Sequence, residues 1–213
     1  MKKLFTAAFF GIMLLGTLWG LLEASMGNIL HWIGLHPYTG VVMTSIGLGL
    51  MSLARKTYKV RWSGPIMGVI AAGCKALDFF VPGSNVIRPM VAILLTAIAF
   101  EAMMIVLEKV KETNLNKVLA GVITGYASIA AFAYVTAYVM QFHYWLNMGF
   151  TGILKYLGTH GWTFGIGGGF LVWAGLTGGA WMDKNAETFL QSRTFYTASS
   201  VLTAICLIAT ILI

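Results

Sequence analysis

Ionisable residues within apolar stretches are the first candidates for chemistry in this sequence. Glu23, Gly27 and His31 recur every four residues, so a carboxylate and an imidazole share one helix face two turns apart. Lys75 and Asp78 lie in a later apolar stretch. Ionisable groups within a bilayer are costly unless they are paired, and they usually mark ligand or ion sites. These residues therefore predict either a polar binding site or an ionic network that fixes helix packing.

Both interpretations of the charged residues stay open at this point. Lys75 and Asp78, three residues apart, can pair on one helix, and Glu23 can pair with Arg88 on another, since arginine binds carboxylates bidentately. By depth, all four lie in the outer half of the membrane. Glu101 lies deeper, on the inner half, where we interpret it as a helix-contact or coupling residue. The expected ligand-binding set is Glu23, Asn28, His31, Lys75, Asp78 and Arg88.

The four histidines, His31, His36, His143 and His160, are a second candidate set. Imidazoles ligate transition metals and haem iron. Their spacing is not diagnostic, because neither HxH nor HExxH occurs, and histidine is also common as a polar tip at a membrane interface. A metal or haem site and a purely structural role both stay open. His31 is the strongest candidate because it shares a helix face with Glu23.

Small residues at four-residue spacing form two further patterns. Gly16, Gly20 and Ala24 recur on one face, as do Gly165 and Gly169 later in the chain. Such faces let helices approach closely, so we expect helix packing or docking of a partner there. The nearby GIGGG run is not a phosphate loop, because no GK[ST] follows it. No GxSxG, Cys–His pair or acidic cluster is present either, which favours a non-enzymatic role; Glu23 with His31 is the one seed for an enzyme.

The composition predicts the elements that position these residues. Of the 213 residues, 58% are hydrophobic and 10% are charged, with a mean hydropathy of +0.81. Soluble domains carry about 25% charged residues. We therefore expect an all-α integral membrane bundle, one domain over residues 1–213, with six to seven transmembrane helices plus an interfacial helix. The expected spans are about 5–31, 39–54, 64–81, 88–107, 117–140, 163–181 and 195–213, the last either spanning or re-entrant, and the interfacial segment, rich in Tyr and Trp, is 141–162.

The distribution of charge predicts orientation. With the N-terminus in the cytoplasm, 11 of the 14 Lys and Arg residues fall on the cytoplasmic side, as the positive-inside rule requires. The net charge of +7 then indicates topology and contact with anionic lipid of the bilayer, not nucleic acid. The MKK start and the apolar run after it predict a retained signal anchor in the plasma membrane. The four histidines lie on the outer side in this arrangement.

Two segments resemble the S components of energy-coupling-factor transporters. They are WGLLEASMGNILHWIGLHPYTGVVMTSIGLGLM (19–51) and RPMVAILLTAIAFE (88–101). The resemblance implies a small membrane protein that binds a vitamin, metal or related nutrient from outside. It also implies docking to a membrane coupling subunit through small residues of the first helix, which Gly16, Gly20 and Ala24 match in kind, and two cytoplasmic ATPases as partners.

A hypothesis from a different class also stays open. The chain could be a membrane subunit of a larger redox or assembly complex. It would hold haem or a metal through the outer histidines, or serve as a scaffold.

Overall fold

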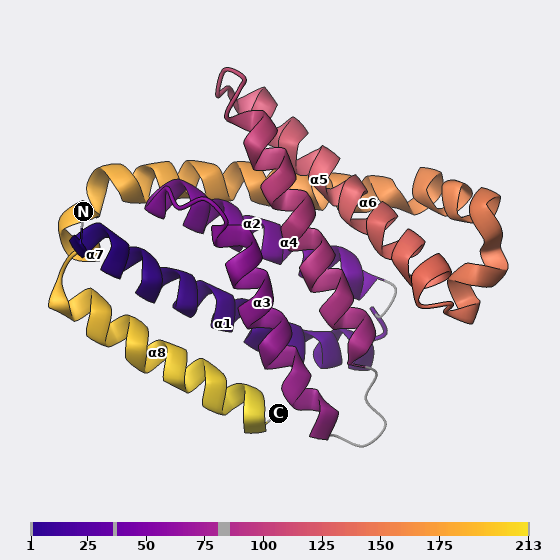
Figure 1. Ribbon diagram of the computed structural model, residues 1–213, viewed down its shortest axis with the longest axis horizontal. Helices are drawn as coiled ribbons and strands as arrows, with labels where there is room; N and C mark the ends of the chain where they lie inside the picture. Colours follow the sequence, from indigo (N-terminus) through magenta and orange to yellow (C-terminus); the bar gives the residue numbers. More distant parts are fainter. Residues whose placement is uncertain (1, 36–37, 81–85, 213) are drawn as a thin grey trace.

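The computed structural model describes residues 2–35, 38–80 and 86–212, and every regular element in these ranges is helical (Figure 1). The all-α prediction is confirmed. The elements are α1 (Lys2–Trp32), α2 (Thr39–Tyr58), α3 (Ser63–Ala76) with a 3₁₀ turn (Leu77–Phe80), α4 (Ile87–Leu107), α5 (Asn114–Tyr134) with a π turn (Val135–Val139), α6 (His143–Asn185), α7 (Glu187–Leu190) and α8 (Arg193–Leu212).

Four helical segments of the described chain are long and apolar enough to cross a membrane. They are Phe5–Met26, Ile87–Leu107, Asn114–Val139 and Arg193–Leu212. This finding supports a membrane protein and includes the final apolar run, whereas a count of six to seven spans stays a prediction. At 14 residues, α3 is about 21 Å long, shorter than the roughly 30 Å of bilayer hydrocarbon.

Side-by-side packing of these helices builds the core. Figure 1 shows α1 and α8 lying beside each other and α6 running along the molecule, and α6 packs against both α2 and α5. The α4 helix lies between α3 and α5. Trp19, Leu48 and Phe100 are among the fully buried side chains at the centre. The result is a layered helix bundle whose interior is filled by side chains from α1, α2 and α4.

The small-residue face of α1 lies against α3. A Cβ atom added to Gly16 would come within 3.1 Å of Ile70, and one added to Gly20 would overlap Cys74. Ala24 on the same face is 2% exposed. The structure therefore uses this face for helix packing inside the bundle, and α3 covers the surface that a docking partner on α1 would need.

Gly165 and Gly169 in α6 serve the same purpose against α5. A Cβ on Gly165 would lie 2.9 Å from the Tyr126 ring, and one on Gly169 would lie 2.9 Å from Val122. A Cβ on Gly125 of α5 would overlap the backbone carbonyl of Phe164. Because the two backbones approach this closely, the glycine tract is a packing surface.

The helix break in the segment after α5 lies elsewhere than the sequence suggests. We expected an interfacial segment to end at residue 162 and a new span to begin at 163, but α6 is helical across this point. The interruption is at Gly149, with φ 62° and ψ 179°, a conformation that residues with a side chain rarely adopt. Trp145 and Ile153 on either side of this break pack against Ala133 and other residues at the end of α5.

Candidate functional site

A cavity of about 430 Å³ lies between α1, α2, α4 and α5. Two ionisable side chains line it, Glu23 from α1 and Arg88 from the first turn of α4. Three threonines contribute hydroxyl groups, and the remaining surface is mostly apolar. The lining includes Thr39, Thr44, Thr96, Trp19, Met43, Ile93 and Phe132. The site is thus a mostly apolar cavity with one acidic side chain, one basic side chain and three hydroxyl groups.

Glu23 is held in place by its own helix. The indole Nε1 of Trp19, one turn earlier, donates a hydrogen bond of 3.3 Å to Glu23 Oε1. Trp19 is 1% exposed, so the donor is fixed by the core. Lys75 of α3 is close enough to interact electrostatically with Glu23. The carboxylate therefore faces the cavity with one fixed donor and a cation nearby.

Arg88 faces the same cavity without an acidic partner in the described chain. Its guanidinium carbon lies 3.9 Å from the centroid of the Phe142 ring, a cation–π contact. The expected ion pair between Glu23 and Arg88 does not form, although both line the cavity. A negative and a positive group thus stand apart on the walls of one chamber.

Lys75 and Asp78 form the ion pair that their spacing predicts. Lys75 Nζ lies 2.6 Å from Asp78 Oδ2, and the two side chains are 12% and 18% exposed. Neither residue lines the cavity. The structure therefore brings Glu23 and Arg88 together around one space, and places the Lys75–Asp78 pair outside it, on the α3 side of Glu23.

The remaining predicted site residues do not gather in the described part of the chain. The side chains of Asn28 and His31, and the whole of His36, lie outside the described residues. His143 and His160 are exposed, and His160 stacks on Tyr156 with ring centroids 4.7 Å apart. Within the described residues, no three His, Cys, Asp or Glu side chains are grouped as a metal site.

A second cluster of charges lies at the other end of α4 and was missed in the sequence. Arg55 Nη1 lies 3.1 Å from Glu101 Oε1, and their side chains are 8% and 3% exposed. The amide of Trp62 also donates to Glu101 Oε1, at 3.2 Å. Glu101 thus joins α4 to α2 and to the turn before α3. The helix-contact interpretation of Glu101 agrees with this geometry, whereas Arg55 looked like one more cation of a basic loop.

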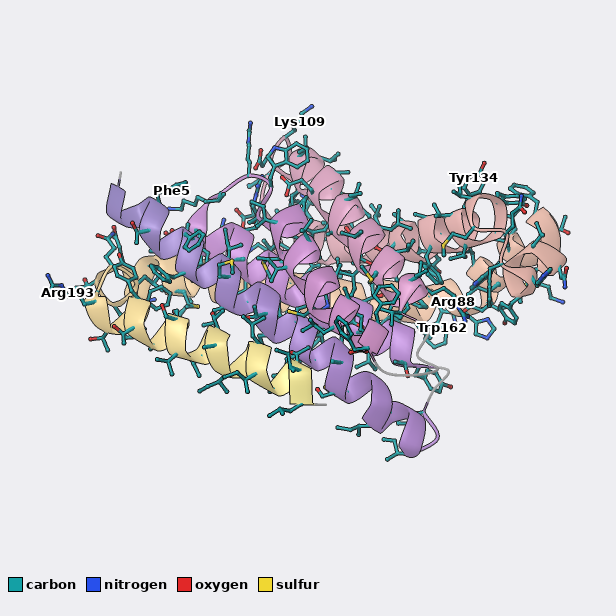
Figure 2. The ribbon with its side chains drawn as sticks, turned by 60° about the horizontal axis from the view of Figure 1, so that its bottom comes forward. Phe5, Arg88, Lys109, Tyr134, Trp162 and Arg193 are labelled. Carbon is teal, nitrogen blue, oxygen red and sulfur yellow. The ribbon has the colours of Figure 1, made fainter. Side chains whose placement is uncertain are left out.

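The rim of this second cluster is a surface network of ion pairs. Arg55 Nη2 donates to Glu108 Oε1 at 2.5 Å, and this bond holds the pKa of Glu108 below its usual range. Lys56 Nζ donates to Glu112 Oε2 at 2.6 Å and lowers the pKa of that carboxyl in the same way. Figure 2 shows Lys109, next to this network, and Arg88 at opposite ends of α4. One end of α4 therefore lies at a network of ion pairs, and the other end lies at the cavity.

No protein-family model, curated protein or solved structure matches this chain. The interpretation of the cavity therefore rests on its own geometry and chemistry.

Proposed function

We propose that the chain is the substrate-binding membrane subunit of an importer of the energy-coupling-factor type. In this role it captures a small molecule, such as a vitamin, metal or related nutrient, in the cavity between α1, α2, α4 and α5. The observation that carries the proposal is the cavity of about 430 Å³ with Glu23 and Arg88 on its walls. Small-molecule sites are typically about 300–1,000 Å³, mostly apolar, with a few polar groups that fix orientation.

The charge distribution supports a cavity that opens to the outside. Arg88 and Lys109 lie at opposite ends of α4, and the lysines and arginines of the ionic network gather at the Lys109 end. Under the positive-inside rule that end faces the cytoplasm of a cell with this protein in its plasma membrane, with the N-terminus on the same side. A ligand then reaches Glu23 and Arg88 from outside.

Transport by such a subunit requires partners. The sequence has no phosphate-binding loop, so energy would come from two cytoplasmic ATPases through a membrane coupling subunit. Because α3 covers the Gly16, Gly20 and Ala24 face, docking of that subunit uses another surface, or follows a movement of α3 away from α1.

Native mass spectrometry of the protein released from its own membrane tests the proposal. We expect a bound small molecule and, in mild detergent, co-purifying ATPase subunits. The variant Ala92→Phe places a ring in the cavity and should abolish ligand binding, whereas Ile98→Phe, at a 60% exposed position on the same helix, should not. A protein that carries no small molecule and brings down no ATPase would contradict the proposal.

A further inference from the structure

The chemistry of Arg88 indicates what the cavity binds. A guanidinium stays charged at any physiological pH and presents a planar fork of N–H donors that matches a carboxylate or phosphate. Arg88 is half-buried and lines the cavity, and among the described residues it forms no ion pair. Its contact with the Phe142 ring is a cation–π interaction at 3.9 Å, which uses none of the N–H donors in a hydrogen bond to an acid. The Arg88 guanidinium therefore has hydrogen-bond donors available for an anion that enters the cavity.

Thr39 supplies a second, independent observation at the same cavity. Its Oγ1 atom is buried and has no hydrogen-bond partner among the described residues, yet Thr39 lines the cavity together with Arg88. Buried hydroxyl groups nearly always have a partner in folded proteins. A hydroxyl group can donate a hydrogen bond to an anion, and a change of the Thr39 rotamer towards the cavity would let a bound ligand accept from this donor.

Glu23 indicates that the ligand also carries a hydrogen-bond donor. An ionised carboxylate offers about four acceptor positions, and the contact from Trp19 occupies one of them. The nearby Lys75 is already paired with Asp78. Glu23 therefore has acceptor capacity left for a hydrogen-bond donor of the ligand, while apolar side chains such as Ile93 line the same cavity.

We infer that the ligand of this cavity is an organic anion with an apolar body and a separate hydrogen-bond donor. Arg88 binds its carboxylate or phosphate group with the help of the Thr39 hydroxyl, and Glu23 accepts from an amino or hydroxyl group elsewhere on the molecule. Met43, Ile93 and Phe132 contact the apolar body. This inference rests on the proposed function, in that it takes the cavity to be the substrate site.

A matched probe series tests the charge requirement. The purified protein in a neutral maltoside detergent is titrated with 3-phenylpropanoate, phenyl phosphate, phenylalanine and 2-phenylethylamine, and binding is measured by calorimetry. We expect the three probes with an anionic group to bind, phenylalanine most tightly because its ammonium group reaches Glu23, and the purely cationic amine not to bind. Equal or tighter binding of the amine overturns the inference.

Substitutions of Arg88 and Glu23 test which residue binds which group of the probe. Arg88→Gln should weaken binding of the anionic probes at least tenfold, Arg88→Lys should weaken it less, and Arg61→Gln, at the exposed arginine of the other end, should leave it unchanged. Glu23→Gln should remove the preference for phenylalanine over 3-phenylpropanoate and keep anion binding. A thermal unfolding curve for each variant shows whether it is folded. Folded Arg88→Gln protein with unchanged affinity overturns the inference.

The molecule that co-purifies with the protein separates this inference from the proposed function. A co-purified nutrient without an anionic group leaves the importer proposal standing and overturns the anion inference. If phosphatidylglycerol, tested against phosphatidylcholine, fills the cavity in an Arg88-dependent way and no soluble anion does, the anion chemistry holds and the importer proposal fails. If no probe, lipid or co-purified molecule binds, both fail.

Discussion

The buried ion pair between Arg55 and Glu101 should respond unequally to loss of either partner. Arg55 contacts three acceptors: Glu101 at 3.1 Å, Glu108 at 2.5 Å and the carbonyl of Val60 at 2.9 Å. Glu101 has Arg55 as its only ion-pair partner among the described residues, and its Oε2 atom is buried without a partner. Removing the acid leaves the arginine paired, whereas removing the arginine leaves a buried acid without its cation.

The magnitudes follow from these contacts. Glu101→Gln keeps an oxygen that accepts from the Trp62 amide and leaves Arg55 bonded to Glu108, so we expect a loss of about 1–2 kcal/mol in unfolding free energy. Arg55→Met removes the cation from a carboxylate that is 3% exposed, and such changes destabilise by about 3–5 kcal/mol. At about 2–4 °C per kcal/mol for a chain of this size, Arg55→Met should lower the unfolding midpoint by roughly 10 °C.

The double variant decides whether the ion pair causes this asymmetry. Arg55→Met with Glu101→Gln should be more stable than Arg55→Met alone, because the second change removes the unpaired charge. Thermal unfolding in detergent, followed by tryptophan fluorescence, gives the midpoints. Arg61→Met is the control, since this 74% exposed arginine also contacts Glu108 and should matter by less than about 1 kcal/mol. Equal losses for the two single variants, or simple addition in the double, would refute the reasoning.

Three further predictions concern helix packing, the break in α6 and pH. Gly125→Ala should destabilise by about 1–3 kcal/mol because its Cβ would overlap the Phe164 carbonyl, whereas Gly158→Ala, with open space around it, should be neutral or stabilising in the same unfolding assay. Gly149→Ala should cost about 1–3 kcal/mol through its positive φ alone, since no atom lies within 4 Å of the added Cβ, and equal midpoints for it and Gly158→Ala would contradict this. The lowered pKa of Glu112 contributes stability that is present above its ordinary value of 4.5 and is lost as pH falls through the lower folded value. The midpoint should therefore drop on acidification below about pH 4.5, and Glu112→Gln should make that drop smaller.

The sequence predicts helices and local pairs because both depend on near neighbours. Apolar runs of sufficient length gave the four membrane-competent segments, and three-residue spacing gave the Lys75–Asp78 pair. The cavity is different, because Glu23 and Arg88 are 65 positions apart and line one space only because α1 and α4 both pack against α2. No pattern in the sequence of either helix indicates that Glu23 and Arg88 line one cavity without forming an ion pair.

Arg55 and Gly149 show two further reasons why sequence reasoning fell short. Arg55 begins a run of basic residues in the last turn of α2, so its charge looked like a topological signal, although its side chain contacts the buried Glu101. No spacing in the sequence reveals this pair, because Arg55 and Glu101 lie 46 positions apart on different helices. Gly149 is one of many glycines in 149–179, and only the backbone geometry distinguishes the glycine that breaks the helix from those, such as Gly165, that pack it.

The two ends of α4 differ in how their acidic and basic side chains are paired, and this contrast favours a ligand in the cavity. Arg55 and Glu101 are paired directly at one end, so the fold is able to bring acid and base from different helices into contact. At the other end Glu23 and Arg88 line the same chamber and stay apart. Ionisable groups that have no ion-pair partner in the described chain raise the free energy of the empty cavity, and a molecule that contacts both groups removes that penalty. Ligand binding should therefore stabilise the fold, and the rise in unfolding midpoint with an anionic probe should vanish in Arg88→Gln.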